Sequence, residues 1–255
     1  YNRQGRVYYL KLVELGLTGL FSEVSQLTQM QQLDLSHNQL PSVPAELSQL
    51  AQLQELKLRG NQLTSIPAEL GQLARLQQLD LSGNRLPSVP VELGQLTRLQ
   101  RLDLSHNQFS FVPGELGQLA RLQELILWGN RLLSLPKELG QLTQLQELNL
   151  EYNELASVPA ELGQLARLQW LRLNNNQLTS LPKELGQLTR LHRLDLEHNQ
   201  LTSLPVELGL LPQLNMLCLA NNPNLSNPPP NVVADGTEAI LTYLRNYQSE
   251  RTPAF

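Results

Sequence analysis

The sequence predicts an α/β solenoid, a horseshoe with a parallel sheet on its concave side and short helical or 3-10 turns on its convex side. A unit of 23 residues recurs without insertion or deletion from residue 30 to residue 213. Each unit holds two leucines one residue apart, which is the alternation of a short strand. An asparagine follows at a constant position, from Asn38 in the first unit to Asn199 in the eighth. One unit cannot bury its own apolar face, so the core must form by stacking.

Each element of the unit follows from its residue types. In Leu33-Asp34-Leu35 both leucines are expected to point inward and the aspartate outward. The asparagine amide both donates and accepts, so we expect it to turn inward and satisfy backbone groups of the loop. The later proline, Pro44 in the first unit, fixes φ and removes a donor, which ends extended pairing. The run Glu-Leu-Gly-Gln-Leu then allows a turn or so of helix before the glycine breaks it.

The full pattern L-x-x-L-x-L-x-x-N-x-L-x-x-[LIV]-P-x-E-L-G-Q-L resembles the leucine-rich repeat over residues 7–222. The first unit is degenerate, with Leu15 where the asparagine belongs, as is typical of a terminal cap. After the last asparagine, Asn222, a proline-rich stretch precedes a predicted helix with Asp235 as its N-cap. One face of that helix carries Ile240, Leu241, Leu244 and Tyr247. The predicted organisation is therefore an N-terminal repeat or cap at 1–29, regular repeats at 30–222, a proline-rich segment and capping helix at 223–248, and a linker toward a downstream domain at 249–255.

The run NNPNLSNPPPNVVADGTEAILTYLRN, residues 221–246, resembles the segment with which the repeats of bacterial-type Roco proteins end. In that family, which includes the leucine-rich-repeat kinases, a Ras-like GTPase domain and a dimerising domain follow. The resemblance implies a repeat domain that regulates or scaffolds a GTPase. Its partner would be those domains of the same polypeptide, a second protomer or another protein. The chain has no G-x-x-x-x-G-K-[ST], so the GTPase chemistry of that family is not in it.

Composition excludes several function classes. A net charge of −4 gives no basic stripe for nucleic acid, and no apolar run is long enough to span a bilayer. Cys218 is the only cysteine, so cap disulfides cannot form within the chain, and a reducing cytoplasmic setting is favoured. We expect no cofactor.

No catalytic or metal site is expected. His37, His106 and His198 each precede a repeat asparagine, and the first two are three repeats, about 15 Å, apart. No histidine pair can therefore hold one metal. Cys218 has Asp195 one strand away but no positioned histidine as its base. Outward strand residues alternate in sign along Asp34, Lys57 and Asp80, as do Arg172 and Asp195, so pairing across the sheet is expected to explain them.

A protein-binding surface is expected where the concave face stops being regular, in residues 122–190. Both tryptophans fall there, and exposed aromatic side chains are typical interface anchors. Strand spacing puts Trp128 and Trp170 about 16 Å apart, which makes two foci. The candidate residues are Glu124, Ile126, Trp128, Glu147, Asn149, Glu151, Tyr152, Trp170 and Arg172.

Two other function classes stay open from the sequence. The repeats could select substrates for a bacterial effector or ligase whose catalytic domain lies elsewhere. They could also belong to a secreted adhesin, although cap disulfides are then common.

Overall fold

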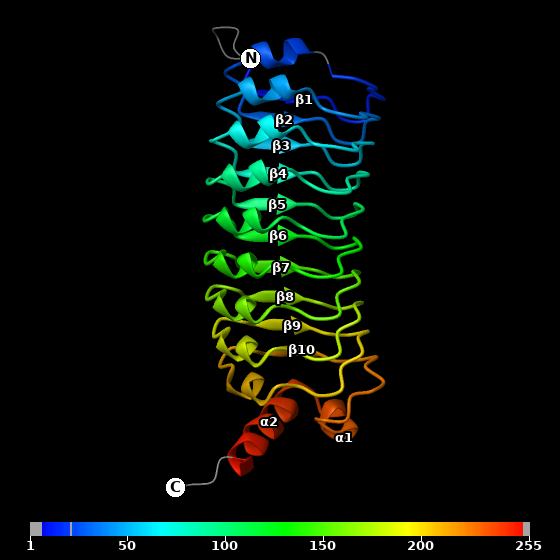
Figure 1. Cartoon of the computed structure of the whole chain (residues 1–255), viewed down its shortest axis with the longest axis vertical. Coiled ribbons are helices and arrows are strands. Elements are labelled where there is room, and N and C mark those ends of the chain that lie inside the picture. The colour runs from blue at the N-terminus through cyan, green and yellow to red at the C-terminus, as the bar shows by residue number, and fades with distance from the viewer. Residues whose placement is uncertain (1–6, 21, 252–255) are drawn as a thin grey trace.

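The computed structural model describes residues 7–20 and 22–251 and confirms the predicted solenoid. Ten parallel strands form one open sheet in chain order, and each strand pairs with the next (Figure 1). Every strand is three residues long, and its central leucine is in register with the central leucine of its neighbour, as Leu102 is with Leu125. The constant repeat length explains this register, because each turn returns the chain to the same height. The strands are β1 (Tyr9–Lys11), β2 (Gln32–Asp34), β3 (Glu55–Lys57), β4 (Gln78–Asp80), β5 (Arg101–Asp103), β6 (Glu124–Ile126), β7 (Glu147–Asn149), β8 (Trp170–Arg172), β9 (Arg193–Asp195) and β10 (Met216–Cys218).

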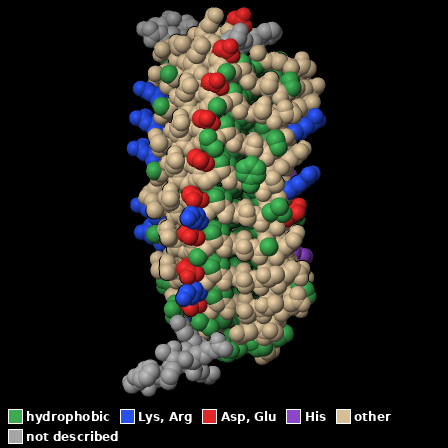
Figure 2. All heavy atoms as spheres, viewed as in Figure 1, with side chains coloured by type: hydrophobic (Ala, Val, Ile, Leu, Met, Phe, Trp, Pro, Cys, Tyr) green, Lys and Arg blue, Asp and Glu red, His purple; other side chains and the backbone are tan. Residues whose placement is uncertain are grey.

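Short 3-10 helices stack along the opposite side, one per repeat. From the second onward, each begins after a proline in extended conformation, such as Pro113 at φ −67° and ψ 142°. Each of these helices has a glutamate in its first turn, and the glutamates form a column of acidic side chains along the stack, as Figure 2 shows. The helices are η1 (Ser22–Gln26), η2 (Ala45–Gln49), η3 (Ala68–Gln72), η4 (Val91–Gln95), η5 (Gly114–Gln118), η6 (Lys137–Gln141), η7 (Ala160–Gln164), η8 (Lys183–Gln187) and η9 (Val206–Leu210).

The glycines of helices η3 to η7 share a role that the sequence did not indicate. A Cβ added to Gly117 would lie 2.3 Å from the carbonyl oxygen of Glu138 in the next repeat. The equivalent glycines from Gly71 to Gly163 show the same clash with the following glutamate carbonyl. In η3 to η7 glycine therefore lets two backbones approach closely, whereas η1 and η2 hold Ser25 and Ser48 at the equivalent position.

The asparagine ladder has the predicted function. Asn153 Nδ2 donates to the carbonyls of Leu127 and Leu150, both at 3.1 Å, and its Oδ1 accepts from Leu132 N at 3.0 Å. Asn38 also serves the degenerate first repeat, because its Oδ1 accepts from the backbone N–H of Leu15 and Leu17. The bond from Leu17 is the one that every repeat makes, so the bond from Leu15 is the addition at the position of the missing asparagine.

The C-terminal end is closed by two helices, α1 (Pro230–Ala234) and α2 (Thr237–Arg251). Ile240, Leu241 and Leu244 are buried, as predicted, and α2 packs on η9 (Figure 1). Asp235 is not the N-cap of this helix. It is the C-cap of α1, because Gly236 at φ 89° turns the chain before α2 begins. Helix α2 also continues through residues 249–251, which the sequence assigned to a linker.

Within the described residues, no helix combines the length and apolarity that crossing a membrane requires.

Candidate functional site

The strand face is the outer surface of the sheet. Each repeat contributes to it the first and third residues of its strand and the residue two positions beyond the strand. The inward leucines between them, such as Leu125 and Leu127, are fully buried. The parallel register places equivalent residues of neighbouring repeats beside each other, as it does Glu124 and Glu147. A change of residue type in consecutive repeats therefore produces a contiguous patch.

An aromatic cluster lies at the carboxyl end of β5–β7. The ring centroids of Trp128 and Tyr152 are 6.5 Å apart, and those of His106 and Trp128 are 3.8 Å apart in an edge-on arrangement. Tyr152 is 55% exposed and Trp128 is half-buried. The sequence predicted the Trp128–Tyr152 pair but missed His106, although His106 precedes Trp128 by almost one repeat.

Two predicted site residues are buried beneath this surface. Ile126 is 9% exposed and Asn149 is 6% exposed, although both are third strand residues that point away from the leucine core. Ile126 does not belong to the main apolar core, so side chains of the strand face cover it. Asn149 Oδ1 accepts from the backbone N–H of Glu151 at 3.1 Å. Both residues support the surface, and neither offers area for a partner.

The charged residues pair differently from the sequence prediction. Arg172 contacts Glu147 at 3.5 Å and Glu151 at 3.8 Å, both on the preceding repeat, and Asp195 binds Arg193 of its own strand at 2.8 Å. The expected Arg172–Asp195 pairing is therefore wrong. The pKa of Glu151 is raised, chiefly because burial penalises its charge, while Arg172 acts in the opposite direction. Glu124, the remaining predicted carboxylate, forms an ion pair with Arg101.

The second tryptophan borders a separate hollow. Trp170 is 38% exposed and Met216 is 43% exposed, and Arg193 lies between them on β9. Together with His192 they line an open hollow of about 410 Å³. Arg172, which the sequence grouped with Trp170, does not line this hollow and instead contacts Glu147 and Glu151. Met216 was missed, although it replaces the polar residue that most repeats hold at that position.

Cys218 lies beside Asp195, as the repeat spacing predicted, and also beside Glu197, which the sequence did not indicate. Its sulfur and the carboxylate oxygens of Asp195 and Glu197 all lie within 4.8 Å of one another, close enough to share a cation. Arg193 already occupies one oxygen of Asp195. Burial, and next the charge of Asp195, raise the pKa of the Cys218 thiol. At neutral pH the sulfur is therefore a protonated thiol, which is a poor nucleophile and a poor metal ligand.

The three histidines have structural contacts that the sequence did not suggest. His37, His106 and His198 adopt left-handed φ values of 57°, 50° and 54°. The ring of His37 covers Gly60, where an added Cβ would lie 2.7 Å from Nδ1, and His198 Nε2 lies 3.0 Å from Asn221 Nδ2. Each ring therefore packs on the corresponding residue of the next repeat.

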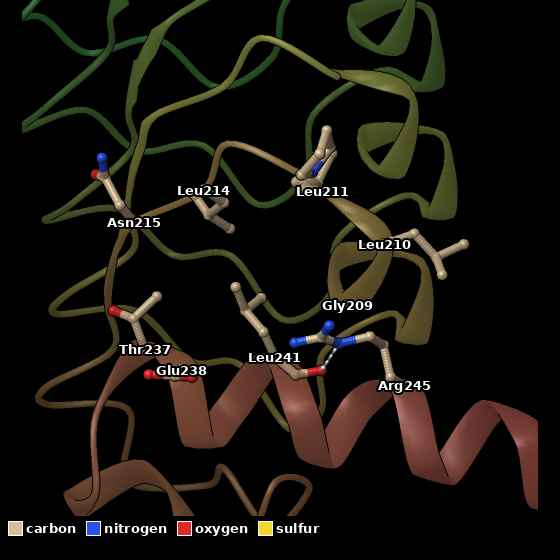
Figure 3. A pocket seen from close by; sticks show the side chains of 10 residues that line it. Gly209, Leu210, Leu211, Leu214, Asn215, Thr237, Glu238, Leu241 and Arg245 are labelled. Atoms are coloured by element: carbon tan, nitrogen blue, oxygen red, sulfur yellow. Dashed lines mark hydrogen bonds between the residues drawn. The ribbon is translucent and has the colours of Figure 1, made fainter.

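A further hollow of about 600 Å³ lies at the end of the solenoid, between η9 and α2 (Figure 3). Leu210, which is 55% exposed, and Leu241 line it, and Arg245 Nε donates across its rim to the carbonyl of Leu241 at 3.2 Å. Its residues come from the capping contact, and we assign it to the cap.

Comparison with known families and structures agrees with this geometry. Family models match residues 6–63 as "Leucine rich repeat", residues 45–160 as "Leucine-rich repeat region" and residues 166–207 as "Leucine Rich repeats (2 copies)". No curated protein matches the sequence significantly.

Solved structures give closer comparisons. A leucine-rich-repeat protein of Leptospira interrogans is 34% identical with a TM-score of 0.55, and the match covers 86% of this chain and 72% of that one. The ectodomain of the Arabidopsis thaliana receptor kinase GASSHO1/SCHENGEN3, solved in complex with CASPARIAN STRIP INTEGRITY FACTOR 2, is 32% identical with a TM-score of 0.75. That match covers 86% of this chain but only 29% of the receptor chain. An internalin from Listeria monocytogenes, 23% identical with a TM-score of 0.70 over 86% of this chain and 65% of that one, shares the fold. The repeat register, the asparagine ladder and these matches together show that the chain belongs to the leucine-rich-repeat family.

Proposed function

We propose that this chain is a non-catalytic module that binds a protein partner through its strand face, over the three repeats that span residues 122–190. The observation that carries the proposal is the clustering of exposed aromatic residues on that face. Trp128 and Tyr152 form one group and Trp170 borders a hollow, whereas most repeats hold small or polar residues at these positions. Aromatic side chains supply large contact areas at low conformational cost and are enriched at interface hot spots.

The comparisons support this reading. The plant receptor ectodomain was solved with a bound factor, and its repeats match this chain over most of the chain's length. A stack of parallel strands presents an extended surface suited to an extended segment of another protein. The described residues offer no alternative chemistry of comparable strength, because Cys218 is held protonated beside two carboxylates.

A peptide-display selection against the immobilised chain tests the proposal. Trp128→Ser and Trp170→Gln restore the residue types of other repeats, so they should leave the fold intact and weaken selected binders about tenfold or more. Phe111→Ser is the matched control, since Phe111 is 56% exposed but lies off the strand face, where other repeats hold serine. Binders that respond to Phe111→Ser but to neither tryptophan variant would contradict the proposal.

We further propose that the parent protein is a cytoplasmic Roco GTPase whose nucleotide domain is regulated or scaffolded by these repeats. The support is the resemblance of residues 221–246 to the end of Roco repeats, together with a single cysteine. If the strand face contacts the GTPase region, contacts that differ between nucleotide states would couple the two.

Calorimetric titration of the isolated chain with GTP should show no binding. Addition of a separately expressed fragment that carries the Ras-like GTPase domain and the dimerising domain of a Roco protein should give binding that depends on Trp128 and on the bound nucleotide. Measurable GTP affinity of the isolated chain, or no binding to the fragment in any nucleotide state, would contradict the Roco assignment. Neither result would affect the binding role of the strand face.

A further inference from the structure

A row of four side chains runs across the strand face from β6 to β9. Trp128, Glu151, Asn174 and Glu197 each lie two residues beyond the end of their strand. Backbone hydrogen bonds join their repeats along this row. The residue after Trp128 donates to the carbonyl of Glu151 at 3.0 Å, and the residue after Glu151 donates to that of Asn174 at 3.1 Å. Parallel strands hold such neighbours about 4.8 Å apart, so the four side chains form one continuous strip. We call this strip the acceptor row.

At the acceptor row, one buried acceptor and one neighbouring buried donor have no hydrogen-bond partner. Glu151 has Arg172 as an ion-pair partner at 3.8 Å, a distance too long for a hydrogen bond. Among the described residues, the buried Nε of Arg172 and the buried Oδ1 of Asn174 have no hydrogen-bond partner. An acceptor that is buried and unpaired is costly, and a donor brought by a ligand removes that cost. Because this oxygen is covered in the free chain, a donor-bearing occupant reaches Asn174 only when a neighbouring side chain of the row moves aside.

The charged groups of the surrounding strand face also favour a ligand that is a cation. On the strand face of β6–β9 the carboxylates outnumber the guanidinium groups by five to two, and one of the five is paired with Arg101 of β5. The carboxylates are Glu124, Glu147, Glu151, Asp195 and Glu197, and the guanidinium groups are Arg172 and Arg193. The strand face of β1–β5 shows no such excess, because four carboxylates there (Asp34, Glu55, Asp80 and Asp103) are matched by four cationic groups (Lys11, Lys57, Arg59 and Arg101). A cation is therefore favoured specifically over the later repeats.

An aromatic surface closes one end of the acceptor row. His106 packs edge-on against Trp128 with centroids 3.8 Å apart, whereas Tyr152 stands 6.5 Å away beside Glu151 and is 55% exposed. A cation within about 6 Å of a tryptophan or tyrosine ring is attracted by the ring, and more strongly where water is excluded. Along the acceptor row, the carboxylate of Glu151 thus lies between the aromatic pair on one side and Asn174 on the other.

We propose that the acceptor row binds an arginine side chain carried by an extended segment of the protein partner. Its guanidinium group donates to Glu151 and to Asn174 Oδ1 and lies against the Trp128–Tyr152 pair. Arginine fits better than lysine, because its planar fork presents five donors and stacks on aromatic rings. The proposal rests on the proposed function, since it names the partner chemistry for the same face.

The test compares two acetylated, amidated tetrapeptides, one of arginine and one of citrulline, which differ in charge but hardly in shape. Titration by calorimetry and by tryptophan fluorescence at low ionic strength should show binding of the arginine peptide, with the citrulline peptide at least about fivefold weaker. Added salt should reduce this difference. Glu151→Gln and Trp128→Ser should each weaken arginine binding about fivefold.

Glu138→Gln is the matched control, because Glu138 lies in the acidic column of the 3-10 helices. Retained arginine binding in this control supports the acceptor row, with urea unfolding showing that each variant is folded. Equal weakening by Glu138→Gln would mean long-range attraction to an acidic protein and would overturn the proposal. Equal affinity for the two peptides would also overturn it. If display selection still yields binders sensitive to Trp128→Ser, the proposed function stands and only the arginine chemistry fails.

Discussion

Replacing one asparagine of the ladder should reveal how much stability a single repeat-to-repeat link contributes. Asn107 is 8% exposed, and its Nδ2 donates to the carbonyls of Leu81 at 3.0 Å and Leu104 at 3.1 Å. Its Oδ1 accepts from the backbone N–H of Leu86 at 3.0 Å. Its Nδ2 also contacts the carbonyl of Ser105 at 3.1 Å, which keeps Gly83 N as a donor at 2.9 Å. The substitution Asn107→Ala therefore removes four contacts at once while adding no bulk.

The carbonyls of Leu81 and Leu104 do not lose their last partner either. Asn84 Nδ2 also donates to Leu81 at 2.9 Å, and Asn130 Nδ2 also donates to Leu104 at 3.1 Å. Only the N–H of Leu86 is left unpaired, at a cost of about 1–3 kcal/mol. The two lost donor bonds contribute about 1 kcal/mol each, so the free energy of unfolding should fall by about 3–5 kcal/mol.

Urea unfolding followed by far-UV circular dichroism measures this change. With a slope of about 3 kcal/mol per molar urea, the midpoint should fall by about 1–2 M. Gln108→Ala is the control, because Gln108 is exposed in the same turn, and its effect should stay within about 0.5 kcal/mol. A loss below about 1 kcal/mol for Asn107→Ala would refute the reasoning, since it would mean that water replaces the asparagine in the ladder.

Three further changes have expected outcomes. Gly117→Ala should lower the thermal midpoint by several degrees, because its Cβ would lie 2.3 Å from a neighbouring carbonyl, whereas Gly19→Ala, with nothing within 4 Å, should not. Because the pKa of Glu151 is raised in the folded chain, this residue contributes stability at pH values below the ordinary carboxyl pKa. That contribution is lost as the pH rises through the raised pKa. Urea unfolding should therefore find Glu151→Gln more stable than the parent at pH 7 but not at pH 4, and a less stable variant at pH 7 would contradict the assignment. Alkylation of Cys218 by iodoacetamide at pH 8 should be slower than that of a free cysteine peptide, because the pKa of the thiol is raised. The Asp195→Asn substitution should accelerate the alkylation, because the charge of Asp195 is the second largest cause of the raised pKa. Unchanged kinetics in Asp195→Asn would show that burial alone controls the thiol.

The sequence was sufficient to predict the architecture, because periodicity determines it. A repeat of constant length with leucines in register can bury them only by stacking, and the inward asparagine follows from the need to satisfy loop backbone groups. The capping helix was also predictable from the spacing of Ile240, Leu241 and Leu244. Its start was not, because Gly236 and the short helix α1 interrupt the chain where Asp235 suggested an N-cap.

The site was predictable only in outline. The sequence located both tryptophans on the strand face, because their positions follow from the repeat. It could not show that Ile126 and Asn149 are covered, since burial of an outward residue depends on the size and rotamers of its neighbours. Charge pairing was mispredicted for the same reason, because long side chains can reach either adjacent strand or a residue of their own, as Arg172 and Arg193 do.

The sequence by itself thus determined that the chain is a leucine-rich-repeat solenoid and which residues of each repeat face outward, because both are properties of a regular period. Only the tertiary structure decided which outward groups are left with unmet hydrogen-bonding capacity. The ion pairing and hydrogen bonding of Glu151 and Asn174 depend on side chains one repeat away. The repeat period places those side chains nearby but does not fix their conformations. Neighbours across repeats, and not position within the repeat, make this part of the strand face a candidate site.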